Sequence, residues 1–341
     1  MSAIENRKKQ HINLAKNPDS QISNAPFADF KLKHRALPEM DYEQVDTSTT
    51  LFRKKLNQPL IIASMTGGTT HADTINTNLA IAVEETGVAM GVGSQRIALE
   101  IKEAEKSFKL ARKNAPTAVI FANMGAVQLN YGRKIEDYQS VVDMLEADGL
   151  YLHLNALQEA IQPEGDTNFA DLLKKIKKVV KKVSVPVFAK EVGHGFDYKT
   201  AKNLLEVGII GIDVAGANGT SWAWIEAKRK GSENLAKWFK DFGISTEKSL
   251  ENSVKARNAF TKKSQNTEKP VAKNKIKLVA SGGIRSPIEG LKAHKLGANY
   301  YSAAKPFLKP ALKNPETLIK VIKEWEKGLK TAMFCTETKN W

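Results

Sequence analysis

The sequence has a single cysteine and no long apolar run, and both absences narrow the class of protein. The one cysteine is Cys335, so a framework of intrachain disulfides and a zinc site built from cysteines are excluded. No apolar run approaches the roughly 18 residues of a transmembrane helix, so a membrane-spanning protein is not expected. Residues 1–10 are polar and charged instead of forming the apolar core of a signal peptide. A cytoplasmic location is therefore the default expectation.

Acidic residues are outnumbered by basic ones, 37 against 52, which gives a net charge of +15. The lysines are nevertheless spread along helical patterns such as 172–182, where Leu172, Ile176 and Val179 alternate with them, as expected for a solvated helix face. No fold signature or basic–aromatic pattern of a nucleic-acid binder is present, so no nucleic-acid partner is expected. A basic surface also steers small polyanionic substrates inward.

Eight short apolar runs occur along the chain, and most of them precede a helical pattern. Continuous apolar runs of this kind are typical of strands in a parallel sheet that is covered on both faces. Eight strand–helix units favour a closed α/β barrel, the (β/α)8 or TIM barrel, over an open doubly wound sheet. The predicted strands are 59–63, 88–91, 118–122, 150–154, 185–189, 209–214, 277–280 and 298–301.

The remaining segments divide the chain into three parts. Residues 1–57 lack the strand–helix alternation and are predicted to form an N-terminal arm covering the barrel mouth. The barrel then occupies 58–330, with an insertion around 222–276, and 331–341 form a C-terminal tail. Within the insertion, the basic and polar stretch 251–275 is typical of a mobile surface segment.

An unusual set of polar side chains follows the fourth predicted strand. His153, Asn155, Gln158 and Glu159 place an imidazole, two amides and a carboxylate within seven residues. His153 points to the same face as Asn155 if the strand continues that far. A buried strand histidine followed by an ordinary helix cap is the alternative to a binding cluster.

The other strand ends carry groups suited to a phosphorylated, partly apolar ligand. The loop 281–285 offers the amides of Gly282 and Gly283 together with Arg285, and Ala303–Ala304 follow the eighth strand. Loops after the seventh and eighth strands bind phosphate in many such barrels, although a plain turn is the alternative. Lys190 ends a buried strand, where a ligand anion or a structural ion pair is needed. With hydrogen-bonding walls from 64–66 and Asn123, these groups suggest flavin mononucleotide.

A second anion site is predicted from three further groups, Arg7–Lys8, Ser94–Gln95–Arg96 and the cluster at 153–158. If the N-terminal arm folds over the barrel mouth, its two cations can join Arg96 around a diphosphate. Glu159 could then hold a Mg²⁺ that bridges the diphosphate, because Mg²⁺ is commonly bound by one or two carboxylates plus substrate phosphates.

An ordered set of motifs along most of the chain resembles the type 2 isopentenyl-diphosphate isomerases. This family consists of FMN-dependent barrels that interconvert isopentenyl and dimethylallyl diphosphate. Two departures are an alanine at Ala215, where serine is common, and a serine at Ser302, where glycine is common. The matching motifs are Arg7–Lys8 with His11–Ile12, 63–68, 92–96, Ala122–Asn123, 153–159, 163–165, 190–193, 219–222 and 281–285.

The resemblance implies the following site residues. Glu159 would bind Mg²⁺. The substrate diphosphate would be held by Arg7, Lys8, Ser94, Gln95, Arg96, His153, Asn155 and Gln158. FMN would be bound by Ser64, Met65, Thr66, Ser94, Asn123, Lys190, Thr220, Gly282, Gly283, Arg285, Ala303 and Ala304.

The resemblance also implies a mechanism and an assembly. The family requires reduced flavin, with NADPH or NADH as the reductant, and the resemblance suggests a homotetramer or larger assembly. A reduced flavin can carry the proton at its ring nitrogens while the protein supplies position and electrostatics. We therefore expect that no single side chain is the acid–base pair. The rival functions are an FMN-dependent barrel oxidoreductase acting on a small acid and, outside enzymes, a basic nucleic-acid-binding protein.

Overall fold

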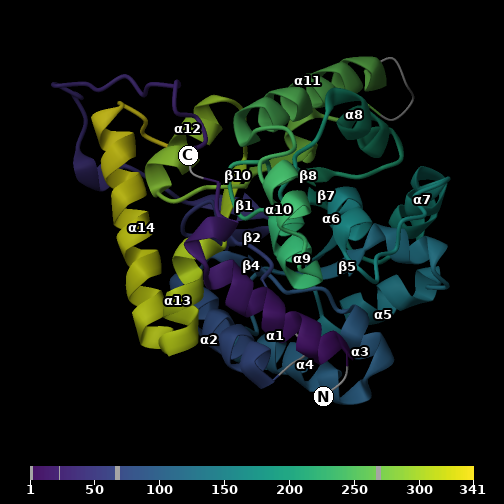
Figure 1. Ribbon diagram of the computed structural model, residues 1–341. Coiled ribbons are helices and arrows are strands. Elements are labelled where there is room, and N and C mark those ends of the chain that lie inside the picture. The colour runs from purple at the N-terminus through teal and green to yellow at the C-terminus, as the bar shows by residue number, and fades with distance from the viewer. Residues whose placement is uncertain (1–2, 23, 66–69, 266–269) are drawn as a thin grey trace.

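The computed structural model describes residues 3–22, 24–65, 70–265 and 270–341. Its centre is a closed barrel of eight parallel strands in the order β10-β3-β4-β5-β6-β7-β8-β9, which confirms the predicted fold class (Figure 1). Each strand coincides with one of the eight apolar runs. The strands are β3 (Leu60–Ile62), β4 (Ala89–Gly91), β5 (Ile120–Gly125), β6 (Gly149–Leu154), β7 (Val187–Glu191), β8 (Gly211–Asp213), β9 (Lys277–Ala280) and β10 (Tyr300–Ala303).

The register of the barrel brings polar side chains from different strands to one level. His153 on β6 pairs with Lys190 on β7, and Lys190 pairs with Asp213 on β8. These positions lie at the carboxyl ends of their strands, where the active sites of such barrels are built. Three strands therefore contribute ionisable groups to the same end of the barrel.

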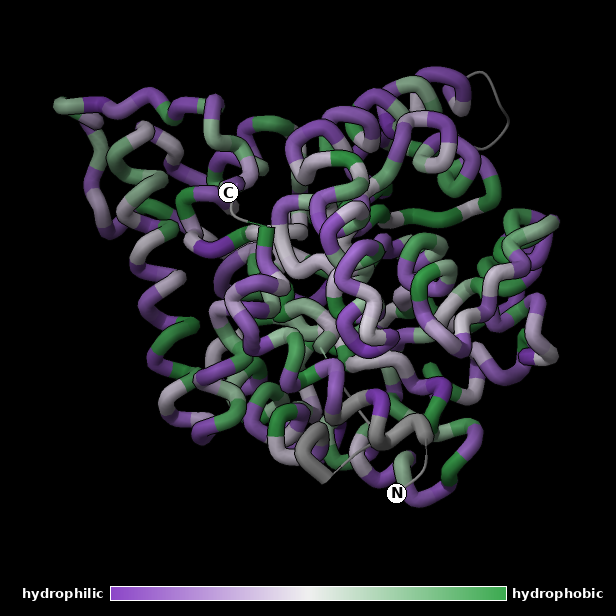
Figure 2. Tube along the Cα trace, viewed as in Figure 1, coloured by the Kyte–Doolittle hydropathy of each residue, from purple (hydrophilic) through white to green (hydrophobic). Residues whose placement is uncertain are grey.

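The outer layer consists of amphipathic helices, and hydrophilic and hydrophobic residues alternate along them in Figure 2. In α7, Leu172, Ile176 and Val179 are buried against the barrel while the lysines between them face outward. The helices that cover the barrel are α2 (Thr70–Thr86), α4 (Glu105–Asn114), α5 (Ile135–Leu145), α7 (Leu172–Lys182), α8 (Tyr198–Glu206), α11 (Thr246–Ser264), α12 (Pro287–Lys295), α13 (Lys305–Lys313) and α14 (Pro315–Cys335).

A short hairpin, which was not predicted, closes the amino-terminal end of the barrel. Strands β1 (Thr49–Leu51) and β2 (Lys54–Leu56) are antiparallel, and their turn places Phe52 and Arg53 at positive φ. The Phe52 ring packs edge-on against Phe121 and Phe188, with centroid distances of 5.3 and 5.6 Å. The hairpin thus packs into one end of the barrel, opposite the end at which the strand-end loops gather.

The insertion after β8 is mainly helical. It contains α9 (Trp222–Lys230), α10 (Glu233–Trp238) and α11. The expectation of a mobile segment at 251–275 is wrong for 251–264, because these residues form most of α11 and bury Ser253, Ala256 and Arg257. This buried face is made of small and polar side chains, so it lacks the apolar periodicity that marks a helix in sequence. Residues 266–269 lie outside the described part.

The N-terminal segment returns across the barrel mouth. Helix α1 (Ala3–Lys16) lies in front of the barrel beside α9 in Figure 1. The next residues pair with the loop after β8, through a bridge between Gln21 and Thr220 and a hydrogen bond from the Ile22 amide to the Gly219 carbonyl.

At the other end of the chain, the Trp341 indole donates to the Asn299 carbonyl at 2.9 Å. No described helix combines the length and apolarity that crossing a bilayer requires.

Candidate active site

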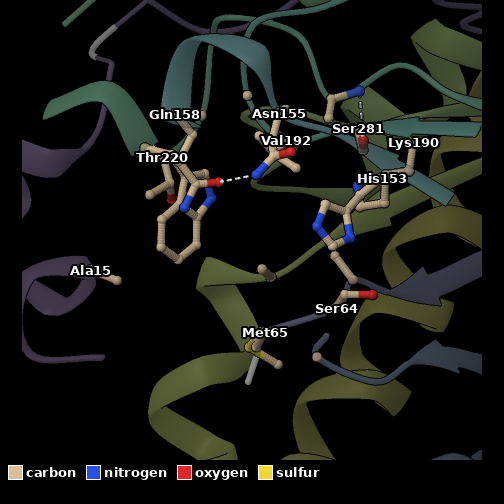
Figure 3. A pocket seen from close by; sticks show the side chains of 18 of the residues that line it. Ala15, Ser64, Met65, His153, Asn155, Gln158, Lys190, Val192, Thr220 and Ser281 are labelled. Carbon is tan, nitrogen blue, oxygen red and sulfur yellow. Dashed lines mark hydrogen bonds between the residues drawn. The ribbon is translucent and has the colours of Figure 1, made fainter. Parts of the chain in front are cut away.

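A cavity of about 600 Å³ lies at the carboxyl end of the barrel strands and is covered by the N-terminal segment. Figure 3 shows His153, Asn155 and Gln158 on one side of this space, with Ser64 and Met65 on another and Ala15 of α1 facing them. The volume is in the range of pockets that enclose a cofactor or a small substrate. Loops from all eight strands reach the cavity, as the strand-end motifs predicted.

One end of the cavity is a glycine cradle after β9. Gly282 and Gly283 have φ values of +99° and +82°, and a Cβ on either would lie 2.2 Å from a backbone oxygen. Only glycine therefore allows this loop to pack against the loop after β8. The Arg285 guanidinium closes the same corner by donating to the carbonyls of Asn218, at 3.2 Å, and Ile22. Ala304 adjoins this corner as the N-cap of α13, and the N-terminus of a helix suits a phosphate.

The floor of the cavity contains a buried ion pair. The Lys190 ammonium lies 3.1 Å from Asp213 Oδ2, and the Ser281 hydroxyl donates to Asp213 Oδ1. The structural partner that was the alternative for Lys190 is therefore present. Asp213 is completely buried, whereas Lys190 retains 8% exposure and lines the cavity. The ammonium thus sits between a buried carboxylate and the ligand space.

His153 is held in one tautomer by its neighbour on β5. Its Nδ1 lies 2.8 Å from Asn123 Oδ1, and the amide of Asn123 is oriented because Nδ2 donates to the Val92 carbonyl. Nδ1 therefore carries the hydrogen. Burial, together with the charges of Lys190 and Arg96, lowers the pKa of His153 to about 4. The imidazole is consequently neutral near pH 7, with Nε2 unprotonated.

Asn155, Gln158 and Glu159 converge because strand β6 ends directly before helix α6 (Ala156–Ile161). The Asn155 side-chain amide donates to Glu159 Oε1 at 2.8 Å, and the Asp166 backbone N–H donates to Glu159 Oε2 at 2.8 Å. Burial raises the pKa of Glu159, and these hydrogen bonds partly oppose that effect. The Asn155 Oδ1 atom is buried without a partner and is therefore able to accept from a ligand.

A buried carboxylate behind this cluster was missed in the sequence. Glu226 on α9 accepts hydrogen bonds from Gln158 at 2.9 Å and from Arg229, and His11 Nε2 lies 2.8 Å from its Oε1. Burial favours the neutral acid, but the contacts with His11, Gln158 and Arg229 hold the pKa of Glu226 at about 2. Its only sequence signal was its place as one of two acids in the tryptophan-rich segment 222–238, which points equally well to a surface helix.

The arginines that line the cavity near Glu159 pair with acidic residues around the rim of the cavity. Arg96 lies 2.8 Å from Asp166, and Arg7 of α1 lies 3.7 Å from Glu164. Burial and the neighbouring Arg96 lower the pKa of Arg7, which indicates like charges brought close together. Two guanidinium groups from distant segments therefore face one region of the cavity.

Most of the predicted site residues line this one cavity. Gln95 is the exception: it is fully buried, with Nε2 donating to the Val141 carbonyl and Oε1 accepting from the Asn123 amide. The structure places it behind the wall, where it fixes Asn123. The Lys8 side chain and Thr66 lie outside the described residues. The predicted residues that line the cavity are Arg7, Ser64, Met65, Ser94, Arg96, Asn123, His153, Asn155, Gln158, Glu159, Lys190, Thr220, Gly282, Gly283, Arg285, Ala303 and Ala304.

The cavity fits a flavin nucleotide in its volume and its polar lining. The hydroxyls of Ser64 and Ser302 are buried beside it without hydrogen-bond partners. Such atoms are costly unless a ligand satisfies them. A metal fits only with a ligand's help, since no group of three His, Cys, Asp or Glu side chains in the described residues could hold an ion. Glu159 can supply one carboxylate, which suits a Mg²⁺ that also binds substrate phosphates.

Full-length relatives decide the family. An isopentenyl-diphosphate delta-isomerase of Hydrogenovibrio crunogenus is 44% identical, with 98% of this chain and 94% of the relative aligned. Enzymes of the same name from Nostoc and Ignicoccus hospitalis are 41% and 40% identical, over 98% and 97% of this chain and 93% and 89% of their own. This chain belongs to the isopentenyl-diphosphate delta-isomerase family. The resemblance drawn from the motifs is therefore confirmed, although no family model matches the chain.

Several solved structures have a similar fold, although their names indicate other activities. A lactate oxidase of Pediococcus acidilactici has a TM-score of 0.64 at 14% identity, covering 99% of this chain and 91% of its own. A mandelate oxidase has a TM-score of 0.61 at 14% identity, covering 97% and 87%. At this identity the likeness concerns the fold alone.

Proposed function

We propose that the protein isomerises isopentenyl diphosphate to dimethylallyl diphosphate, using reduced FMN and Mg²⁺. The observation that carries this proposal is one cavity with two different anion-binding ends. The glycine cradle at Gly282–Gly283 serves one phosphate, and the guanidinium groups of Arg7 and Arg96 serve another. A flavin nucleotide and a diphosphate substrate need both ends in a single space.

At the flavin end, the glycine cradle and the amides around Ala303–Ala304 would hold the FMN phosphate. The isoalloxazine ring would lie over the barrel floor, where Lys190 lines the cavity and the Ser64 and Ser302 hydroxyls await partners. Met65, Ser94 and Thr220 line the same space. NADPH or NADH would supply the reducing electrons.

At the substrate end, the diphosphate would be gripped by Arg7 and Arg96, with Lys8 of the same helix as a further cation. His153, Asn155 and Gln158 would orient it from the end of β6. Glu159 would bind Mg²⁺ together with phosphate oxygens, because the ion normally takes few protein carboxylates and completes its shell with phosphates and water. The prenyl part would then contact apolar side chains that also line the cavity, such as Met65, Val192 and Trp222.

The reaction needs a proton delivered at one carbon and removed at another. When bound, a reduced flavin supplies proton transfer at its ring nitrogens. Among the described side chains that line the cavity, none offers an acid–base pair for this step: Glu159 is engaged with the Asn155 side chain and the Asp166 backbone amide, and burial keeps His153 neutral. Their role in the proposal is to orient the diphosphate and exclude water.

The test is incubation of the purified protein with isopentenyl diphosphate, Mg²⁺, FMN and substoichiometric NADPH under anaerobic conditions. We expect many equivalents of dimethylallyl diphosphate for each NADPH oxidised. An oxidoreductase acting on a small acid, which the barrel neighbours alone would suggest, would consume electrons in proportion to product. Product formation without added flavin in protein lacking visible absorbance would contradict the role of FMN.

We also propose that the protein is a homo-oligomer, a tetramer or larger. Two aromatic side chains of the insertion, one at the end of α10 and one between α10 and α11, support self-association, since Trp238 and Phe242 are 63% and 57% exposed in the single chain. Light scattering of the purified protein tests this assembly directly. A single species with the mass of one chain, 37.6 kDa, would contradict it.

A further inference from the structure

The buried pair below the cavity contains a carboxylate that the proposed reaction does not use. Asp213 is completely buried at the end of β8, beside Lys190 in the register of the barrel. A buried carboxylate is expensive unless it is paired and hydrogen-bonded. Asp213 has both kinds of partner, Lys190 on Oδ2 and the Ser281 hydroxyl on Oδ1. It does not line the cavity, so it cannot contact a ligand itself.

The position of Asp213 determines the net charge of the cavity floor. Lys190 is the member of the pair that reaches the cavity, and its ammonium lies 5.9 Å above the centre of the Tyr151 ring. The neighbouring titratable groups on β6 are His153 and Tyr151. Burial lowers the pKa of His153 to about 4, and burial together with Asp213 raises that of Tyr151 well above its ordinary value. Both are neutral near pH 7, so the floor contributes one positive and one negative charge.

We infer that Asp213 is a positioning residue that fixes the Lys190 ammonium under the ligand and cancels most of its charge. The inference rests on the proposed binding of FMN in this cavity. A lone ammonium in a buried site strongly favours an anion above it, whereas a carboxylate 3.1 Å from that ammonium offsets the attraction. A Lys190 ammonium without this carboxylate would lower the pKa of the reduced flavin ring and favour loss of its proton. The ion pair with Asp213 prevents this loss. A flavin that must give and take protons needs this balance.

The substitution Asp213→Asn tests this inference, because it removes the charge and keeps the shape. The readout is the dissociation constant of FMN from the flavin-free protein, measured for the oxidised form and, after reduction by dithionite, for the two-electron-reduced form. We expect the ratio of the oxidised to the reduced constant to rise about tenfold or more in the variant. A tenfold change equals about 30 mV in the two-electron reduction potential.

A matched control and a double variant separate charge from folding. Asp148→Asn makes the same chemical change at the opposite end of the barrel, where Asp148 pairs with Lys54 and Arg112. This control should leave the ratio unchanged. Adding Lys190→Met to Asp213→Asn removes both charges, so the ratio should return to within about threefold of the wild-type value. An unchanged ratio in Asp213→Asn, or a shift that persists in the double variant, overturns the inference.

Wild-type protein provides a second measurement that does not depend on the folding of a variant. Reduced flavin bound to the wild type should lose its ring proton at a pH equal to or higher than free reduced FMN does, as followed by absorbance. A pH clearly below that of free FMN would mean an uncompensated lysine and overturns the inference. Failure of the wild type to bind FMN at all would instead contradict the proposed function, so the two failures are distinct.

Discussion

His11 Nε2 lies 2.8 Å from Glu226 Oε1, and this contact joins the N-terminal helix α1 to helix α9 over the cavity. The same carboxylate accepts from Gln158, so the covering helix and the substrate side of the cavity share one buried anion. Burial lowers the pKa of His11, while the contact with Glu226 opposes that effect. The position of the cover is thus coupled to the orientation of a residue proposed to bind the diphosphate.

Replacing the carboxylate of Glu226 should loosen the packing of helix α1 over the cavity. We expect Glu226→Gln to lower the free energy of unfolding by about 2 kcal/mol, because a buried charge that accepts from Gln158 and Arg229 and lies against His11 is lost. The same variant should raise KM for isopentenyl diphosphate and speed tryptic cleavage within α1. Urea unfolding, kinetics and timed proteolysis measure the three effects. Glu233→Gln is the control, since Glu233 is 77% exposed and its pair with Lys228 contributes little. Equal behaviour of the two variants would contradict the coupling.

A side chain added in the glycine cradle should weaken FMN binding, whereas one added at a distant glycine should not. Gly283→Ala and Gly132→Ala both place alanine at a positive φ, +82° and +84°, which costs about 1 kcal/mol in each case. Only the Cβ at 283 meets an obstacle, the Asn218 carbonyl at 2.2 Å, whereas nothing lies within 4 Å of the Cβ at 132. We therefore expect Gly283→Ala to lose FMN on gel filtration and Gly132→Ala to retain it. Retention by both would show that the phosphate lies elsewhere.

Metal dependence should follow Glu159. EDTA is expected to abolish isomerisation and Mg²⁺ to restore it, while the bound FMN remains. Glu159→Gln should raise the Mg²⁺ concentration for half-maximal activity tenfold or more, because the amide oxygen is a weaker ligand than a carboxylate. Titrations of activity against Mg²⁺ measure this, with Glu316→Gln on the exposed start of α14 as the control. A Glu159→Gln titration that matches the wild type would remove Glu159 from the metal site.

The buried imidazole of His153 should make the flavin-free protein sensitive to acid. Its pKa is about 4 in the fold against an ordinary 6.5, so the unfolded chain binds more protons between these values. Stability should therefore fall as the pH decreases from about 6.5 to 4, by up to about 3 kcal/mol. His153→Asn should flatten this part of the profile in urea unfolding, and His34→Asn, at an exposed position, should not. Parallel profiles for wild type and His153→Asn would exclude His153 as the cause.

Local pattern was sufficient to predict the barrel. Strands buried on both faces must be apolar whatever their partners, so the eight runs were visible without knowledge of the pairing. The helical pattern at 172–182 also matches α7, Leu172–Lys182, because its apolar residues recur at helical spacing and the lysines between them face solvent. Helix α11 was missed, since the face that it buries consists mainly of serines and threonines, with one leucine, one alanine and one arginine.

The strand-end motifs determined which residue types gather at the barrel mouth, because parallel strands end together at one face. Only the tertiary structure decided which partner each of those residues contacts. It turned Gln95 away from the cavity to hold Asn123, and it brought Glu226 to His11 across a large sequence separation. It also set Asp213 beside Lys190 through strand register. A charge in a sequence has no fixed partner; only the register of the barrel and the path of the covering helix bring a particular acid within about 3 Å of a particular base.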